Sequence, residues 1–123
     1  TPKFRIAGYA HSGVAPEVMG IGPIPAVRSL CERTGLSIGD FDVIESNEAF
    51  AAQAIAVSRE LGFDAAKVNP NGGAIALGHP VGATGTILTV KTMYELDRIS
   101  GRYGLITMCI GGGQGIALAI ERL

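Results

Sequence analysis

Residues 103–120 read YGLITMCIGGGQGIALAI, and they indicate two paired strands. The run Tyr103–Ile110 is apolar and predicts a buried strand. Gly111-Gly112-Gly113 favours a tight turn, after which Gly115–Ile120 is predicted to return as the antiparallel partner of a hairpin. The C-terminal part of the chain is therefore expected to be an antiparallel part of a sheet.

Upstream of this hairpin, predicted strands alternate with predicted helices. Strands are expected at residues 4–10, 42–45 and 67–69. The connecting helices are expected at residues 25–34, 48–61 and 82–97. This order predicts an α/β fold with a mixed, mostly parallel five-stranded sheet, helices packed on it and an antiparallel C-terminal hairpin.

Local signals predict the ends and faces of these helices. Gly35 and Gly62 suit C-terminal caps, and Ser37 with Asp40 resembles a capping box. Apolar spacing predicts one face for each of the two later helices. These faces comprise Phe50, Ala54, Val57 and Leu61 in the first, and Ile87, Val90 and Tyr94 in the second.

Composition excludes several classes of function. The 123 residues are expected to form one domain, residues 1–123, with one core. A formal net charge of −1 without a basic cluster argues against nucleic-acid binding. No apolar run approaches the roughly 20 residues that span a bilayer. The two cysteines favour a reducing compartment, the cytoplasm, and no residue spacing suggests a metal site.

Three polar side chains fall at the carboxyl ends of predicted strands, where ligands gather in α/β sheets. Asn47 follows the second strand, His79 lies in a glycine-rich loop after the third, and Cys109 closes the fourth. They are expected at one edge of the sheet. An imidazole and a thiol in one pocket there would support proton transfer and acyl chemistry.

His79 has a chemical rationale of its own. Imidazole exchanges protons near neutral pH, so it can activate a thiol or donate to a thioester oxygen. The helix expected from Gly82 would direct its positive end toward this loop. The simpler alternative is a loop histidine held by hydrogen bonds. His11 lacks any such pattern and is expected at the surface or in a turn.

The two cysteines differ in their surroundings. Cys109 precedes three glycines, and a thiol there becomes a useful base if a histidine or exposed amides lower its pKa. Its alternative is a buried apolar role, which is the preferred interpretation for Cys31 on a helix face. Asn47 could simply cap the helix expected from Glu48, and this role would not exclude a catalytic one.

Four segments carry a family resemblance. They are Met19–Ala26 (MGIGPIPA), Asn47–Ala51 (NEAFA), Gly78–Gly85 (GHPVGATG) and Cys109–Gly113 (CIGGG). In order and spacing, the last three resemble the C-terminal motifs of the thiolases, and the match covers essentially the whole chain. Thiolases cleave 3-ketoacyl-CoA with CoA, or condense two acyl-CoA molecules in the reverse direction.

The resemblance implies a role for each matching residue. His79 would activate a nucleophilic cysteine and bind the thioester oxygen, and Cys109 would remove a proton from acyl-CoA or CoA. The Gly111 N–H would help to form an oxyanion hole, and Asn47 would hold a water beside His79. CoA thioesters would be substrates rather than cofactors. Substrate contacts are expected from Met19, Phe50 and Gly78.

The chain departs from the thiolase pattern at the nucleophile. In thiolases an N-terminal half supplies the nucleophilic cysteine and the loop domain that holds much of CoA, and Cys31 does not match that cysteine. The resemblance therefore implies a C-terminal domain that is inactive alone. It would act with an N-terminal half in cis or in trans, within a homo-oligomer when complete.

Three other interpretations remain open. Ketoacyl synthases share the fold and a Gly-His motif, but they generally place a second histidine where Asn47 stands and lack a cysteine matching Cys109. A non-catalytic domain could bind acyl-CoA or a partner chain. A scaffold domain would predict no consequence from Cys109→Ser or His79→Ala.

Overall fold

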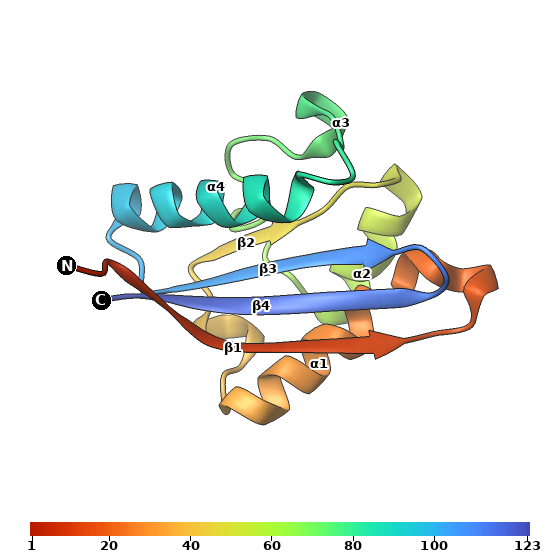
Figure 1. The fold of residues 1–123 in the computed structure, drawn as a ribbon, viewed down its shortest axis with the longest axis horizontal. Coiled ribbons are helices and arrows are strands. Elements are labelled where there is room, and N and C mark those ends of the chain that lie inside the picture. Colours follow the sequence, from red (N-terminus) through yellow and green to blue (C-terminus); the bar gives the residue numbers. More distant parts are fainter.

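A computed structural model describes residues 1–123, and a single sheet is at its centre (Figure 1). The strands lie side by side in the order β1-β4-β3-β2. Strand β3 pairs antiparallel with β4 and parallel with β2, and β1 pairs antiparallel with β4. The strands are β1 Phe4–Gly13, β2 Val43–Ser46, β3 Tyr103–Ile110 and β4 Gln114–Arg122.

The α/β class and the C-terminal hairpin are confirmed, but the sheet has four strands instead of five and is mostly antiparallel. Residues 67–69 form only an isolated bridge, between Val68 and Ile44. The next residue, Asn69, takes a left-handed conformation with φ of 45°, and Pro70 has no N–H to donate. A fifth strand therefore cannot continue from the bridge.

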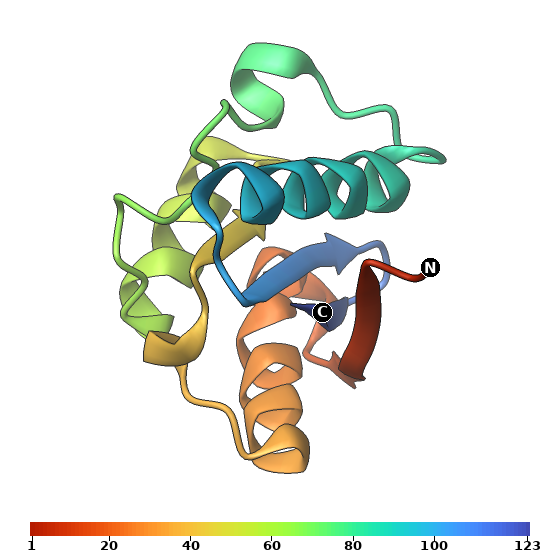
Figure 2. The same ribbon diagram turned by 90° about the vertical axis from the view of Figure 1, so that its left-hand side faces the viewer.

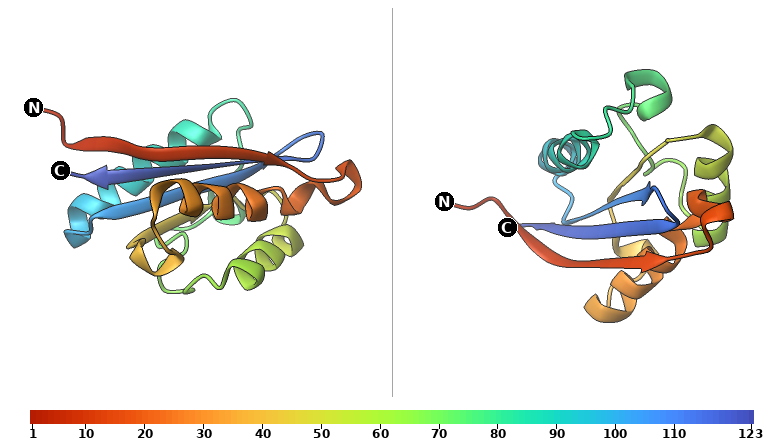
Figure 3. Two further views of the ribbon diagram at one scale, coloured as in Figure 1. Left: turned by 90° about the horizontal axis from the view of Figure 1, so that it is seen from below. Right: turned by 45° about the vertical axis from the view of Figure 1, so that its right-hand side comes forward.

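Helices cover both faces of the sheet (Figure 2). Helix α1 packs on β1 and β4, whereas α4 packs on β2 and β3. Seen from below, α1 and α2 lie together on one face (Figure 3). The helices are α1 Pro23–Thr34, α2 Ala51–Leu61, α3 Ala74–Leu77 and α4 Thr84–Ile99, with 3₁₀ helices η1 Pro16–Ile21 and η2 Ile38–Asp40.

Two apolar cores, one on each face of the sheet, hold the sheet and its two helical layers together. On the α1 face, Val27 and Leu30 pack with strand residues such as Leu105, and all three are fully buried. On the α4 face, Leu88 and Leu96 pack with strand side chains that include Ile106. Because successive strand residues point to opposite faces, Leu105 and Ile106 belong to different cores.

The predicted apolar face of α4 is wrong. Ile87, Val90 and Tyr94 are 40%, 43% and 75% exposed, whereas Leu88 and Thr92 are buried. The Thr92 hydroxyl donates to the Leu88 carbonyl at 2.8 Å, and this bond allows a polar side chain in the core. Helix α4 therefore buries Leu88, Thr92 and Leu96 and leaves an apolar strip, residues 87, 90 and 94, exposed.

Several predicted helix ends are confirmed. Gly35 and Gly62 cap α1 and α2 in the left-handed conformation, with φ of 72° and 65°. The Asp40 carboxylate accepts hydrogen bonds from the N–H and hydroxyl of Ser37, both at 2.7 Å. Helix α2 begins at Ala51 rather than Glu48, so its predicted start is wrong.

Candidate active site

A cavity of about 420 Å³ lies beside the end of β3. The β3–β4 turn, η1 and the start of α4 gather at this end of the sheet, away from the two termini (Figure 1). Five of the predicted site residues line the cavity. They are Met19, Phe50, His79, Cys109 and Gly111. The remaining lining residues are Ala49, Val81, Met108 and Ile110, so the wall carries no lysine, arginine, aspartate or glutamate.

Two predicted site residues do not line this cavity. Gly78 is exposed and ends α3 with φ of 94°, a conformation that favours glycine. It thus shapes the loop ahead of His79. Asn47 is buried behind the cavity wall, where its side-chain nitrogen lies 3.4 Å from His79 Nε2.

His79 is held by Thr84, the first residue of α4. The Thr84 hydroxyl lies 2.9 Å from the Pro80 carbonyl oxygen, to which it donates its only proton, and 2.7 Å from His79 Nδ1. The hydroxyl must then accept a hydrogen bond from Nδ1–H. Neutral His79 therefore carries its proton on Nδ1, which leaves the Nε2 lone pair available as a base.

A main-chain hydrogen bond to β3 fixes the position of Asn47. Its N–H donates to the Thr107 carbonyl at 2.9 Å, which continues the parallel pairing of β2 with β3. Its side-chain Oδ1 is buried and accepts no hydrogen bond within the chain. Since α2 begins at Ala51, the alternative role of Asn47 as its cap is wrong. The side chain instead presents an unused acceptor beside His79, and buried acceptors normally bind a partner.

Cys109 and Gly111 present a thiol and an amide at the end of β3. The Cys109 side chain is only 8% exposed, and this burial raises the pKa of its thiol. The expected lowering of that pKa is therefore not produced by residues of this chain, and the thiol is a proton donor at neutral pH. No hydrogen bond within the chain uses the Gly111 N–H, which stays available to an oxyanion.

Close glycine contacts bring η1 and Met19 to the cavity. Gly22 and Gly115 touch through their main chains, since a Cβ on Gly115 would lie 2.0 Å from the Gly22 carbonyl oxygen. Gly113 has φ of 93° and meets Val14, whose N–H donates to the Gly113 carbonyl at 2.6 Å. Side chains at these glycines would force η1 away from the hairpin and open the cavity.

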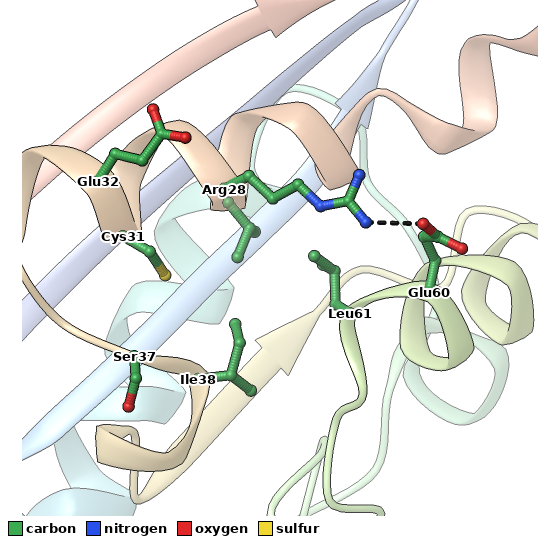
Figure 4. A pocket seen from close by; sticks show the side chains of 8 residues that line it. Arg28, Cys31, Glu32, Ser37, Ile38, Glu60 and Leu61 are labelled. Atoms are coloured by element: carbon green, nitrogen blue, oxygen red, sulfur yellow. Dashed lines mark hydrogen bonds and ion pairs between the residues drawn. The ribbon is translucent and has the colours of Figure 1, made fainter.

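Cys31 lies in a different pocket, of about 290 Å³ (Figure 4). The thiol points toward Ile38 and Leu61, and the nearby Arg28–Glu60 ion pair joins α1 to α2 at 2.6 Å. Burial also raises the pKa of this thiol, which is partly exposed and packs against the edge of the core on the α1 face. His11 is exposed on β1, as predicted.

Two further residues of the chain contact the site or the loop that carries His79, and only Thr84 was missed by the sequence analysis. Thr84 lies in the segment Gly78–Gly85, in which the sequence analysis considered only the histidine and the glycines. It comes five residues after His79 and is in the first turn of α4. Glu48 contacts the loop that leads to His79, with its carboxylate 2.9 Å from the Ile75 N–H. Threonine is not unusual at a helix end, so the sequence alone gave no reason to single out Thr84, whereas Glu48 belongs to the same matching segment as Asn47 and is expected to position the residues beside it.

In a reaction that uses His79 as a base, we expect Thr84→Val to lower kcat by roughly 10- to 100-fold, because small misplacements of a reacting group cost up to about 10² in rate. The substitution keeps the shape of the side chain but removes the acceptor of His79 Nδ1–H. Steady-state kinetics checks the result. Thr84→Ser should retain most activity.

Thr92→Val is the matched control, because it removes a hydroxyl from the same helix that bonds only a carbonyl four residues earlier. Equal kcat values for Thr84→Val, Thr92→Val and the unmodified protein would contradict a role for Thr84 in orienting His79.

The structure contains no helix long and apolar enough to cross a membrane. It also contains no group of three or more histidine, cysteine, aspartate or glutamate side chains that could hold a metal ion.

Comparison with known proteins identifies the family. The family model described as the C-terminal domain of thiolase matches residues 1–122. The chain belongs to the thiolase family. Its thiolase relatives include the beta-ketothiolase BktB of Cupriavidus necator, 62% identical over 122 residues, and the beta-ketoadipyl-CoA thiolase of Pseudomonas putida, 62% identical over 125 residues. These alignments cover 99% and 100% of this chain, but 31% of each relative.

Solved thiolase structures share the fold. Human mitochondrial 3-ketoacyl-CoA thiolase in complex with CoA superposes with a TM-score of 0.98 and 51% identity. The acetyl-CoA acetyltransferase of Bacillus anthracis gives the same TM-score with 50% identity. Both matches cover the whole of this chain and 31% of the other chain. The thiolase resemblance read from the motifs is thus confirmed, and the chain spans about a third of the relatives it matches.

Proposed function

We propose that residues 1–123 are the C-terminal catalytic domain of a thiolase. In the complete enzyme, an N-terminal half in cis or in trans supplies the nucleophilic cysteine, and the reaction is thiolysis of 3-ketoacyl-CoA or condensation of acyl-CoA. The supporting observation is the single cavity that His79, Cys109 and the unused Gly111 N–H share. That combination offers a base, an acid and an oxyanion donor within one site.

His79 activates the incoming nucleophile. The lone pair on Nε2 accepts the proton of the nucleophilic thiol, and the resulting thiolate attacks the substrate carbonyl carbon. Nε2–H can then donate to a thioester oxygen. The adjacent Asn47 amide, with its unused Oδ1, is placed to hold a water against the same oxygen. Together they stabilise the enolate oxygen.

Cys109 moves the second proton. In condensation the Cys109 thiol first gives its proton to the CoA thiolate that leaves when the nucleophilic cysteine is acylated. The Cys109 thiolate so formed removes a proton from the methyl carbon of a second acyl-CoA, and that carbon attacks the acyl group held on the nucleophilic cysteine. A carbon–carbon bond forms, and the carbon–sulfur bond to the enzyme breaks. In thiolysis the Cys109 thiol returns a proton to the departing enolate and then accepts one from CoA. The Gly111 N–H binds the oxyanion during acyl transfer.

Exposed apolar side chains on the domain surface also support contact with an N-terminal half. The apolar strip on α4, Ile87, Val90 and Tyr94, is exposed although it adjoins the core-forming side of the helix. The cavity wall is apolar apart from His79 and Cys109, which suits an uncharged thioester and acyl group. An N-terminal half packed on this side would cover the strip and close the cavity.

Turnover of acetoacetyl-CoA by CoA tests the proposal. The complete protein should produce acetyl-CoA, and the purified chain of residues 1–123 should produce none at equal concentration. Turnover by the chain alone would contradict its dependence on a second half. CoA binding by the complete protein without any turnover would instead indicate a non-catalytic acyl-CoA-binding protein.

A further inference from the structure

The two residues that flank Asn47 are both tied to the segment that leads to His79. Ser46, before Asn47, is bonded to Asn69. Glu48, after Asn47, is bonded to the main chain at Ile75. Two cross-links therefore enclose the residue whose side chain meets His79, and both connect the end of β2 to the loop between residues 69 and 79.

The first cross-link replaces the missing fifth strand. Asn69 Oδ1 accepts the Ser46 N–H at 3.0 Å, and Asn69 Nδ2 donates to the Ser46 carbonyl at 2.9 Å. The Asn69 N–H donates to the Ile44 carbonyl at 2.8 Å. The side-chain amide thus satisfies both main-chain groups of Ser46, as a neighbouring strand would. This geometry requires φ of 45° at Asn69, which asparagine adopts more readily than most residues.

The second cross-link joins Glu48 to the loop at the surface of the domain. Glu48 Oε2 accepts the Ile75 N–H at 2.9 Å. Gly73 lies against the same carboxylate, since a Cβ on Gly73 would come within 2.3 Å of it. Ile75 is four residues before His79, and the short helix α3 connects them. The Glu48 carboxylate therefore fixes the position of the start of α3, and α3 in turn positions the main chain of His79.

We propose that Glu48 and Asn69 are positioning residues for the Asn47–His79 pair. Neither lines the cavity, so neither contacts the substrate. Each fixes one side of Asn47 relative to the His79 loop, and together they set the 3.4 Å separation between the Asn47 amide and His79 Nε2. This inference rests on the proposed function, because it assigns these residues to the same reaction.

Independent contacts should preserve the fold when a cross-link is removed. Lys91 of α4 binds Glu45 at 2.9 Å and the Gly72 carbonyl at 2.5 Å, so β2, α4 and the loop stay connected. Thr84 continues to hold the His79 ring. Loss of a cross-link is therefore expected to shift Asn47 against His79 rather than to unfold the domain.

Glu48→Ala in the complete enzyme should lower kcat by roughly 10- to 100-fold, with KM changed by less than about threefold, because misplaced groups lose rate more than binding. Glu48→Gln keeps an acceptor for the Ile75 N–H and should restore most of kcat. Asp64→Ala is the matched control, since it removes an exposed carboxylate that accepts the Ala66 N–H at 3.0 Å away from the site. Its kcat should stay unchanged.

Asn69→Gly tests the other cross-link without backbone strain, because glycine accepts the positive φ. It should lower kcat to a similar extent, and Asn69→Asp should lower it too, because a carboxylate oxygen then takes the place of the amide N–H beside the Ser46 carbonyl oxygen. If both residues act through Asn47, the double variant Glu48→Ala/Asn69→Gly should lose less than the product of the two single losses. A crystal structure of Glu48→Ala should show a longer Asn47–His79 contact.

Unchanged kcat in Glu48→Ala and Asn69→Gly would overturn the proposal. Equal losses in Glu48→Ala and Glu48→Gln would also overturn it, since the hydrogen-bond acceptor would then not be the important feature. The unmodified enzyme and His79→Ala are assayed in parallel. Lack of turnover in the former, or full turnover in the latter, would indicate failure of the proposed function itself.

Discussion

His79→Ala is expected to lower kcat of the complete thiolase by about 10²–10⁴-fold, the usual contribution of a positioned general acid–base group. The substitution removes the Nε2 base that activates the nucleophile and the donor to the thioester oxygen. It leaves the loop main chain held by Glu48 and Asn69. Pre-steady-state acylation by acetyl-CoA should be slowed to a comparable degree.

His11→Ala is the matched control for this substitution, because His11 is exposed on β1 and lines no part of the cavity. It should leave kcat unchanged. A rate for His79→Ala within about twofold of the unmodified enzyme would contradict general acid–base catalysis, which contributes 10²–10⁴-fold. That result would support the scaffold interpretation.

Cys109→Ser is expected to lower the rate of condensation by about 10²–10⁴-fold, because a hydroxyl is a far weaker acid than a thiol and does not readily form the anion that removes the methyl proton. The most specific readout is exchange of acetyl-CoA methyl protons with solvent D₂O. Exchange needs removal of that proton but no carbon–carbon bond formation. It should disappear in Cys109→Ser while acylation of the nucleophilic cysteine persists.

Cys31→Ser is the control, because that thiol occupies the separate pocket between α1 and α2. Proton exchange that survives in Cys109→Ser and disappears in Cys31→Ser would reverse the assignment of the two cysteines.

The raised pKa of Cys109 should also slow its alkylation. A thiol with a raised pKa stays protonated as pH rises through the ordinary range, so its alkylation by iodoacetamide should be slow at pH 7 and accelerate only in alkaline solution.

The site was more predictable from sequence than the sheet was. Asn47 and Cys109 lie at the carboxyl ends of β2 and β3, which run parallel, and the bridge at Val68 ahead of His79 is parallel as well. The carboxyl ends of parallel strands meet at one edge of a sheet whatever the order of the strands. The cavity that contains His79 and Cys109 follows from that rule. Residues 67–69 show the limit of the same reasoning, because a short apolar run cannot reveal that Asn69 will turn left-handed and pair through its side chain.

The orientation of α4 could not be predicted because its two sides have similar hydrophobicity. Ile87 and Val90 indicated the buried face, yet Thr92 is buried once its hydroxyl bonds the preceding turn. Glu45 is likewise fully buried and is paired with Lys91 at 2.9 Å, although burial still raises the pKa of its carboxyl. Hydrogen bonds and ion pairs of this kind depend on the tertiary arrangement, which apolar spacing does not record.

A crystal structure of the complete protein after reaction with acetyl-CoA is the most direct test. The account predicts an acetylated cysteine from outside residues 1–123, with its sulfur facing His79 Nε2 and its thioester oxygen within hydrogen-bond distance of the Gly111 N–H. Cys109 should face the acetyl group as a free thiol. Acetylation of Cys31 or Cys109, or an acetylated cysteine remote from this cavity, would contradict the account.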